Sequence, residues 1–166
     1  MIVLETARLV LRRISTHDAE FILRLLNEPS FLRYIGDRGV RTLEDAQAYI
    51  AKGPINSYDR HGFGLFLVSR KDDGVPIGMC GLLKRDTLRD VDVGFAFLPE
   101  FWGHGYAFEA ASAVLSYGKE VLGLGRIVAI TSPDNDGSIR VLTKLGMRFE
   151  GMIQLTDSEP EVRLFA

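Results

Sequence analysis

The sequence is poor in cysteine, in charge of one sign and in long apolar stretches. Its single cysteine, Cys80, excludes an internal disulfide framework and a cysteine-based zinc cluster. Lysine and arginine number 20 against 22 aspartates and glutamates, so the chain lacks the basic excess typical of a dedicated nucleic-acid-binding protein. No apolar stretch reaches the length of a membrane-spanning helix. We therefore expect a cytoplasmic protein that has no metal site and binds neither nucleic acid nor membrane.

The chain also lacks internal repeats, low-complexity tracts and linker-like segments. Its 166 residues, of which 46% are hydrophobic, predict a single domain over residues 1–166 with a full core. The N-terminal segment MIVLETARLVLRRIS is interrupted by Glu5, Arg8 and Arg12, which distinguishes it from a signal peptide.

Helix and strand patterns alternate along the chain. Capping-box sequences at Ser15–Asp18 and Thr42–Asp45 predict two helix starts, and the second helix is expected to end near Lys52. Residues 27–41 and 55–62 are expected to be irregular loops. Strands are expected at residues 7–14, 63–69, 76–84, 91–98, 126–131, 147–155 and 161–165, and further helices after residues 105 and 135.

The order of these elements is β-α-α-β-β-β-α-β-α-β-β. It predicts a mixed sheet with helices packed on its faces, in the α/β or α+β class. Strands 63–69 and 76–84 should form a hairpin, because a turn cluster separates them. Strands 91–98 and 126–131 should be parallel neighbours joined by a right-handed helical crossover. The alanines of that crossover helix would let it approach the sheet closely.

The stretch FLPEFWGHGYAFEA, residues 97–110, places two glycines where a strand gives way to a helix. The first N–H groups of a helix have no intrahelical partner, and the helix dipole makes that end positive. Glycines before it allow left-handed dihedrals that point backbone amides at one anion. One interpretation is that these amides hold a pyrophosphate, and the alternative is a tight turn with no ligand. The amides concerned belong to Gly103, His104, Gly105, Tyr106 and Ala107.

Three phosphate-binding motifs compete for this turn. A dinucleotide fingerprint needs a third glycine where the chain has Phe108. A P-loop needs Gly-Lys followed by Ser or Thr, but the only Gly-Lys pair, at 118–119, is followed by glutamate inside a predicted helix. The third motif is the pyrophosphate loop of acetyl-CoA-dependent N-acyltransferases, Gln/Arg-x-x-Gly-x-Gly/Ala. The segment WGHGYA, residues 102–107, fits it with Trp102 in the Gln/Arg place.

Three separated segments, in the right order, carry a resemblance to a known family. WGHGYAFEA (102–110) is similar to the pattern Trp-Gly-x-Gly-Tyr-Ala-x-Glu-Ala, and ETARLVLRRIS (5–15) to an opening strand with Thr-x-Arg-Leu-x-Leu-Arg. PDNDGSIRVLTKLGMRFEG (133–151) is similar to an Asn-x-x-Ser helix that ends in Lys-Leu-Gly-Phe. The chain therefore resembles the GNAT superfamily of N-acetyltransferases. Within it, the chain looks like the ribosomal-protein-alanine acetyltransferase-like (RimJ/RimL-type) branch.

The resemblance implies a twisted, mostly antiparallel sheet of about seven strands with a central parallel pair and helices on both faces. It implies acetyl-CoA as the donor and a primary amine as the acceptor, either a protein N-terminal α-amine or a small-molecule amine. A monomer or a homodimer paired through the final strands is compatible with it. The residues that it implies for coenzyme A binding are Phe97, Leu98, Trp102, Gly103, His104, Gly105, Tyr106, Ala107, Asn135 and Ser138.

The expected reaction is direct attack of the amine on the thioester in a ternary complex. A covalent route would need an activated thiol, and Cys80 lies in an apolar strand, as a packed and inert cysteine would. Direct attack needs a base, a donor for the developing oxyanion and an acid for the thiolate. The candidate base is Asp92, directly or through a water chain, and the alternative is a solvated strand residue. The candidate donor is the amide of Phe97 or Leu98, and the candidate acid is Ser138.

Several residues around these candidates have structural alternatives. Asn135 is expected to cap the helix that follows it, and Ser138 could do the same. Glu109 is expected to stabilise the dipole of its helix. His104 is expected at the surface, and Lys144 is either a contact for a coenzyme A phosphate or an exposed helix lysine.

Two other functions would use the same turn. The first is a non-catalytic acyl-CoA-binding or regulatory module, which would bind coenzyme A and consume no acceptor. The second is a nucleotide-dependent transferase, which the missing P-loop and dinucleotide patterns disfavour. The acceptor would be selected by residues 27–41 and 55–62, whose mixed charges mark no trap for a polycation.

Overall fold

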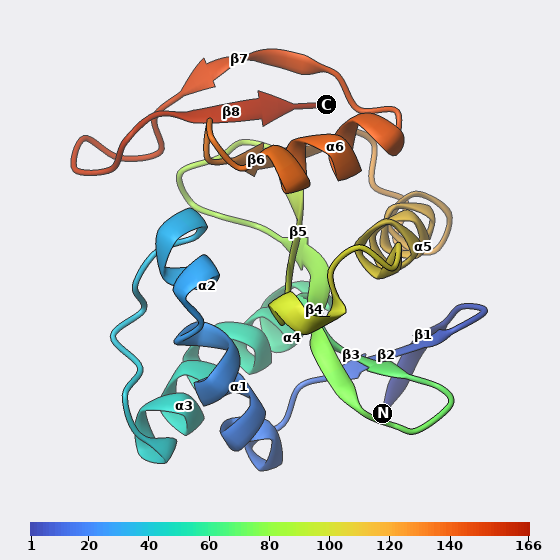
Figure 1. Ribbon diagram of the computed structural model, residues 1–166. Coiled ribbons are helices and arrows are strands. Elements are labelled where there is room, and N and C mark those ends of the chain that lie inside the picture. The colour runs from blue at the N-terminus through green and yellow to red at the C-terminus, as the bar shows by residue number, and fades with distance from the viewer.

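A single eight-stranded sheet runs through the molecule in the computed structural model, which describes residues 1–166 (Figure 1). Its strand order is β1-β2-β3-β4-β5-β6-β8-β7, and every neighbouring pair is antiparallel except β5 and β6. The strands are β1 (Ile2–Glu5), β2 (Leu9–Arg13), β3 (Leu65–Arg70), β4 (Pro76–Leu83), β5 (Val91–Phe97), β6 (Ile127–Thr131), β7 (Phe149–Ile153) and β8 (Val162–Phe165). The predicted mixed sheet with a central parallel pair is confirmed.

Helices cover both faces of this sheet. They are η1 (Thr16–Asp18), α1 (Ala19–Leu26), α2 (Pro29–Tyr34), α3 (Leu43–Ile50), the π-turn η2 (Ala51–Ile55), α4 (Asn56–His61), η3 (Pro99–Phe101), α5 (Tyr106–Glu120) and α6 (Asp136–Lys144). Side chains of α5 and α6 pack with Val93 and Phe97 of β5 in one core. Side chains of α1, α2 and α3 pack with Ala96 of β5 in a second core. Alternation along β5 therefore assigns Asp92 to the α1–α3 face.

The crossover helix α5 lies close against the sheet, as its small residues predicted. Ala110, Ala111 and Val114 are fully buried. At Gly118 an added Cβ would lie 2.8 Å from the Cδ1 atom of Ile127 in β6. This spacing leaves no room for a side chain, so the helix approaches β6 at a glycine.

The local signals at the two capping boxes are confirmed. The Ser15 hydroxyl accepts the His17 N–H, and the Asp18 carboxylate accepts the Ser15 N–H. At the start of α3 the Thr42 hydroxyl accepts the Asp45 N–H, and the Asp45 carboxylate accepts the Thr42 N–H. The predicted hairpin of β3 and β4 also forms, with Ser69 opposite Pro76.

Three expectations about the chain were wrong. Residues 2–5 form an additional strand, β1, beside β2. Residues 27–41, expected to be irregular, contain α2. Residues 55–62, expected to be a loop, are mostly α4, because the helix does not stop near Lys52 but continues through η2 to His61.

The helix continues through Pro54 in a widened turn. Proline lacks the N–H that an α-helix interior requires, so it normally ends or kinks a helix. Here the chain widens into a π-turn in which the Asn56 N–H reaches back to the Ala51 carbonyl. The helix then ends at Gly62, which has a φ of 78°.

No helix in the structure combines the length and the apolar composition that crossing a bilayer requires.

The buried hydroxyl of Tyr58 ties α4 to the sheet. It accepts the Ile14 N–H at 2.9 Å and donates to the Leu65 carbonyl. Burial raises the pKa of Tyr58 to about 12. This single side chain satisfies backbone groups beside β2 and in β3 that no other residue reaches.

We expect Tyr58→Phe to lower the free energy of unfolding by about 1–3 kcal/mol, because it leaves a buried donor and a buried acceptor unpaired. Urea unfolding monitored by circular dichroism measures the change. Tyr117→Phe is the matched control, since the Tyr117 hydroxyl makes no hydrogen bond, and it should change stability by less than about 0.5 kcal/mol. Equal losses in both variants would contradict this role for the Tyr58 hydroxyl.

Candidate active site

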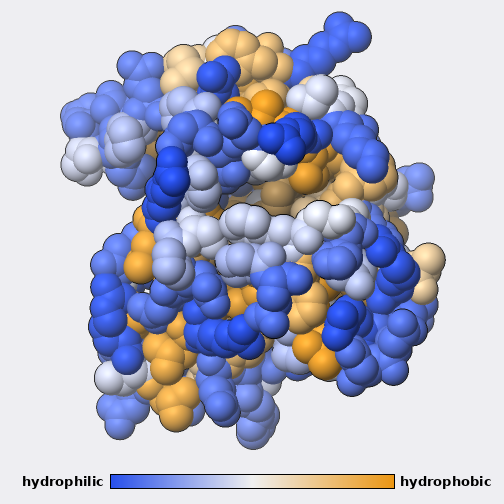
Figure 2. Space-filling model, in the orientation of Figure 1, coloured by the Kyte–Doolittle hydropathy of each residue, from blue (hydrophilic) through white to orange (hydrophobic).

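The two parallel strands of the sheet separate toward their carboxyl ends. They pair only at Val91 with Ile127 and at Asp92 with Val128. Beyond these pairs β6 turns away with β7, β8 and α6, which form the upper part of the molecule in Figure 1. In the space-filling view the surface is hollowed between this part and the helices α1–α4 below, with apolar side chains at the bottom of the hollow (Figure 2). The backbone of β5 from Val93 onward therefore has one edge without a strand partner.

The glycine turn follows directly at the end of β5. Gly103 and Gly105 both have a φ of 80°, in the left-handed region that glycine tolerates. None of the backbone N–H groups of residues 103–108 donates to an acceptor in the protein, and the first bond of α5 runs from the Glu109 N–H to the Gly105 carbonyl. No side chain caps α5, in contrast to α3 and α6. The turn thus presents six successive free amides at the positive end of the longest helix.

Two residues of the N-terminal strand region hold this turn from behind. Glu109 accepts the Thr6 hydroxyl at 2.5 Å, the Arg8 backbone N–H at 2.9 Å and the Arg8 Nε–H at 2.7 Å. The Arg8 guanidinium also donates to the His104 carbonyl at 3.0 Å and lies 4.5 Å from the centre of the Tyr106 ring. Glu109 was expected only to stabilise the helix dipole, and the structure shows that it also joins α5 to residues 6–8.

These contacts change the acidity of Glu109. Partial burial acts to raise its pKa, but the hydrogen bonds from Thr6 and Arg8 outweigh it and lower the pKa below its usual range. The carboxylate is therefore stabilised in its charged form.

The end of β5 offers one free amide next to the turn. The Leu98 N–H donates to the Ile77 carbonyl of the β4 side at 3.0 Å, so it is already used. By strand alternation the Phe97 N–H points to the opposite edge, where β6 has separated. The Phe97 carbonyl, on that same edge, accepts the Trp102 indole N–H at 2.9 Å. Trp102 thus lies at the mouth of the opening with about half of its surface exposed.

Asp92 lies at the closed end of the opening, on the α1–α3 face. It is 1% exposed, so the alternative of a solvated strand residue is wrong. Its carboxylate pairs with Arg85, with Nε–Oδ1 at 3.0 Å. Burial raises its pKa, and the nearby Arg85 opposes this effect. Five residues of strand, about 16 Å, separate it from Phe97.

Asn135 and Ser138 lie on the other side of the sheet, at the start of α6. The Asn135 side chain accepts the Ser138 N–H at 3.2 Å, so the expected helix cap is present. The Ser138 hydroxyl makes no hydrogen bond in the protein. The structure therefore places the candidate base and the candidate acid on opposite faces of the sheet and does not bring them together.

Comparison with known proteins identifies the family. A model described as "Acetyltransferase (GNAT) domain" matches residues 8–148. The chain belongs to the GNAT acetyltransferases. It is 34% identical over 153 residues, 92% of this chain and 86% of the relative, to the uncharacterized N-acetyltransferase YoaA of Bacillus subtilis strain 168.

Solved structures agree with this assignment. A GNAT-family acetyltransferase from Bacillus anthracis is 28% identical and superimposes with a TM-score of 0.80 over 99% of this chain and 96% of that one. RimL, a ribosomal L7/L12 α-N-protein acetyltransferase solved with coenzyme A, shares the fold with a TM-score of 0.85 at 16% identity, over 99% of this chain and 96% of that one. The chain is thus an N-acetyltransferase, and enzymes of the GNAT fold use acetyl-CoA.

Two features of this GNAT domain have no signal in the sequence. The Thr131 hydroxyl, at the carboxyl end of β6, is buried and has no hydrogen-bond partner. A threonine at the end of an apolar strand gives no sign in the sequence that its hydroxyl will be buried without a hydrogen-bond partner. The second is the contact of Arg8 with Glu109, although both residues lie in segments that carried the family resemblance. The two residues are 101 positions apart along the chain, so no local pattern predicts their contact.

Of the remaining candidates in the GNAT domain, Cys80 is confirmed as a packed residue. It is 0% exposed, and burial raises the pKa of its thiol. His104 is exposed beside Tyr106. The ammonium of Lys144 lies 4.3 Å from the centre of the Phe108 ring, at a groove of about 550 Å³ along α5.

The ion pair of Glu109 predicts a pH-dependent contribution to stability. Its pKa is lowered on folding, so the contribution is complete above the unfolded value of about 4.3 and is lost as the pH falls through the folded value. Glu109→Gln should lower the free energy of unfolding at pH 7 by about 1 kcal/mol, and the difference from the wild type should shrink toward pH 3.5.

Urea unfolding at stepwise pH measures this difference. Glu120→Gln, at the exposed far end of α5 and without an ion pair, is the control and should show no such trend. A gap between wild type and Glu109→Gln that stays constant from pH 7 to pH 3.5 would exclude the charged contact as its cause.

Proposed function

We propose that this chain transfers the acetyl group of acetyl-CoA to a primary amine by direct attack within a ternary complex. The observation that carries the proposal is the run of six free backbone amides at residues 103–108, at the N-terminus of α5 and beside the open edge of β5. Such an end of a helix binds anions, and six successive amides offer donors for both phosphates of a diphosphate. The buried, unpartnered Thr131 hydroxyl on the neighbouring strand supports a polar ligand between β5 and β6.

Acetyl-CoA would supply an activated thioester, and the residues of this chain would bind it and stabilise the charge that develops during transfer. The amides of residues 103–108 hold the phosphates, and Trp102 lines the path toward the opening. The Phe97 N–H donates to the thioester oxygen as negative charge builds up on it. The amine nitrogen bonds to the acetyl carbon while the carbon–sulfur bond breaks. The buried Cys80 takes no part.

The proton transfers are assigned to opposite faces of the sheet. The Ser138 hydroxyl, which is free of protein partners, donates toward the departing sulfur from the α6 side. Asp92 accepts the proton of the amine from the α1–α3 side. Because about 16 Å of strand separates Asp92 from Phe97, the proton reaches it through a chain of waters. A raised pKa makes this carboxylate a better proton acceptor than an exposed aspartate.

The experiment that tests the proposal is acetyl-CoA turnover, followed by the release of free thiol. The acceptor panel contains N-terminal peptides, lysine, polyamines and aminoglycosides. Consumption of acetyl-CoA with a stoichiometric acetylated amine supports the proposal. Tight coenzyme A binding without transfer to any amine would favour the non-catalytic acyl-CoA-binding module instead.

Gly103→Ala should raise the dissociation constant of coenzyme A about tenfold, because alanine at a φ of 80° costs roughly 1–2 kcal/mol and turns the amides away from their common point. Its new Cβ would meet no atom within 4 Å, so no clash obscures the result. Isothermal titration calorimetry measures the constant.

Gly123→Ala is the matched control for this measurement. Gly123 has a φ of 68° and equally open surroundings, but it lies beyond the far end of α5. The Gly123→Ala variant should lose about as much stability as Gly103→Ala but keep the wild-type affinity for coenzyme A. If the two variants bind coenzyme A with equal affinity, the cofactor does not bind at the turn that contains Gly103.

Asp92→Asn should lower kcat by about 100-fold and leave the affinity for coenzyme A unchanged, because it removes the proton acceptor but not the binding amides. Ser138→Ala should lower kcat less, since water can protonate the thiolate. Steady-state kinetics from pH 6 to pH 10 separate these effects. A wild-type kcat in Asp92→Asn would exclude Asp92 as the base.

A further inference from the structure

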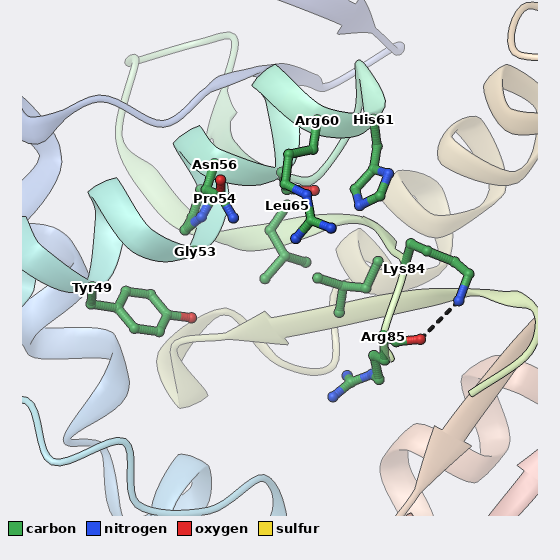
Figure 3. A pocket seen from close by; sticks show the side chains of 11 residues that line it. Tyr49, Gly53, Pro54, Asn56, Arg60, His61, Leu65, Lys84 and Arg85 are labelled. Carbon is green, nitrogen blue, oxygen red and sulfur yellow. Dashed lines mark hydrogen bonds between the residues drawn. The ribbon is translucent and has the colours of Figure 1, made fainter. Parts of the chain in front are cut away.

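A second pocket lies on the α1–α3 face of the sheet, away from the glycine turn (Figure 3). It has a volume of about 200 Å³, and eleven residues from the end of α3, from η2 and α4, from β3 and from the end of β4 line it. None of the eleven carries a carboxylate, and of its three cationic residues, Arg60, Lys84 and Arg85, only Arg85 forms an ion pair, with Asp92. The pocket is therefore electrostatically suited to an anion.

Several hydrogen-bond donors in this pocket are free. Arg60 forms no ion pair in the protein, and in Figure 3 its side chain reaches from α4 toward the end of β4. The Tyr49 hydroxyl makes no hydrogen bond and points into the pocket in the same view. Burial raises the pKa of Tyr49, so its hydroxyl keeps its proton. Lys84 is held by the carbonyls of Arg85 and Leu88, both at 2.8 Å, but its charge is not neutralised.

Arg85 is fixed in place by Asp92. It uses its Nε–H and one NH2 group on the buried carboxylate, at 3.0 and 3.5 Å. A guanidinium has five N–H groups, so donors remain for a second anion. The ion pair thus orients Arg85 at the edge of the pocket and leaves part of its fork unused.

The pocket is adjacent to the strand where transfer is proposed. Leu65 and Leu83 line it, and a Cβ added at Gly94 of β5 would lie 3.3 Å from Leu83 and 3.8 Å from Leu65. Gly94 is three residues, about 10 Å, from the Phe97 amide, and Arg85 lies farther away, beside Asp92 at about 16 Å. The pocket lies on the face of the sheet opposite α5 and its glycine turn.

We propose that this pocket binds a carboxylate or phosphate group of the acceptor, at about 10–16 Å from the amine that receives the acetyl group. The inferred site presupposes the acetyl transfer proposed above, because it binds another part of the same acceptor. Extended peptide advances about 3.5 Å per residue, so the Cα atom of the third residue lies about 7 Å from the amine, and an acidic side chain there reaches farther, toward the pocket. A water molecule occupies about 30 Å³ of liquid, so the volume suits one acidic side chain with a few waters.

The same charges discriminate against polycationic acceptors. A polyamine would bring like charges toward Arg60, Lys84 and Arg85, which weakens binding. The acceptor class that fits is an amine with a negative group at its far end.

Four peptides test the proposal on the wild-type protein. They are Ala-Ala-Glu-Ala amide, its Gln and Lys counterparts, and the counterpart with phosphoserine at the third position, all with a free N-terminal amine. We expect kcat/KM for the Glu peptide to exceed that for the Gln peptide by about tenfold, and the Lys peptide to be the poorest. The phosphoserine peptide shows which anion the pocket prefers. Equal use of the Glu, Gln and Lys peptides would overturn the proposal.

Two variants test the residues. Arg60→Gln and Tyr49→Phe remove groups that make no hydrogen bond in the folded protein, so they should fold normally, and each should reduce the Glu-to-Gln preference by about threefold or more. Lys52→Gln, which removes an exposed charge from η2 outside the pocket, and Tyr117→Phe are the matched controls and should keep the preference. A preference that survives both pocket variants would also overturn the proposal.

A binding experiment separates this proposal from failure of the transfer itself. If coenzyme A binds and neither these peptides nor any amine of the acceptor panel is acetylated, the proposed function fails, and the pocket is then judged by titration of ¹⁵N-labelled protein with the Glu and Gln peptides. The amides of residues 56–61 and 83–85 should shift with the Glu peptide alone, and Arg60→Gln should abolish the shift. No shift in the wild type would overturn the anion site.

Discussion

The uncapped N-terminus of α5 is the constraint on which the rest of the site depends. Six successive amides without acceptors are costly in a folded protein unless water or an anion meets them. The chain keeps them aimed outward with two left-handed glycines and anchors the first turn from behind through Glu109, Thr6 and Arg8. The negative charge of Glu109 balances the helix end without filling the space in front of its amides.

The separation of β5 and β6 is the second constraint, and it follows from how short their pairing is. Two residue pairs hold the strands together, and the remaining edge of β5 has no strand partner. The helices then divide the two faces: α5 and α6 cover one, and α1, α2 and α3 the other. A donor can approach from the first face and an acceptor from the second. The ion pair of Asp92 with Arg85 lies on the second face and links the closed end of the opening to the basic pocket.

Most of the elements were predictable because their signals are local. The two capping boxes, the β3–β4 hairpin and the α5 crossover each depend on a few neighbouring residues, and all three formed. The helix through Pro54 was not predictable, since the π-turn that accommodates proline is stabilised by burial of Pro54 and by the Tyr58 hydroxyl against the sheet. β1 was missed because its four residues show little alternation and depend on pairing with β2.

The sequence by itself determined the family and the glycine turn, because backbone freedom at Gly103 and Gly105 and the order of three motifs are properties of the residues alone. It also determined that Cys80 would be packed. Only the tertiary structure decided that Glu109 meets Arg8, that Asp92 is buried beside Arg85, and that the charges around Arg60 surround a pocket without a carboxylate. These facts depend on contacts between distant segments, and charge and burial are set by what surrounds a side chain rather than by its neighbours in the chain.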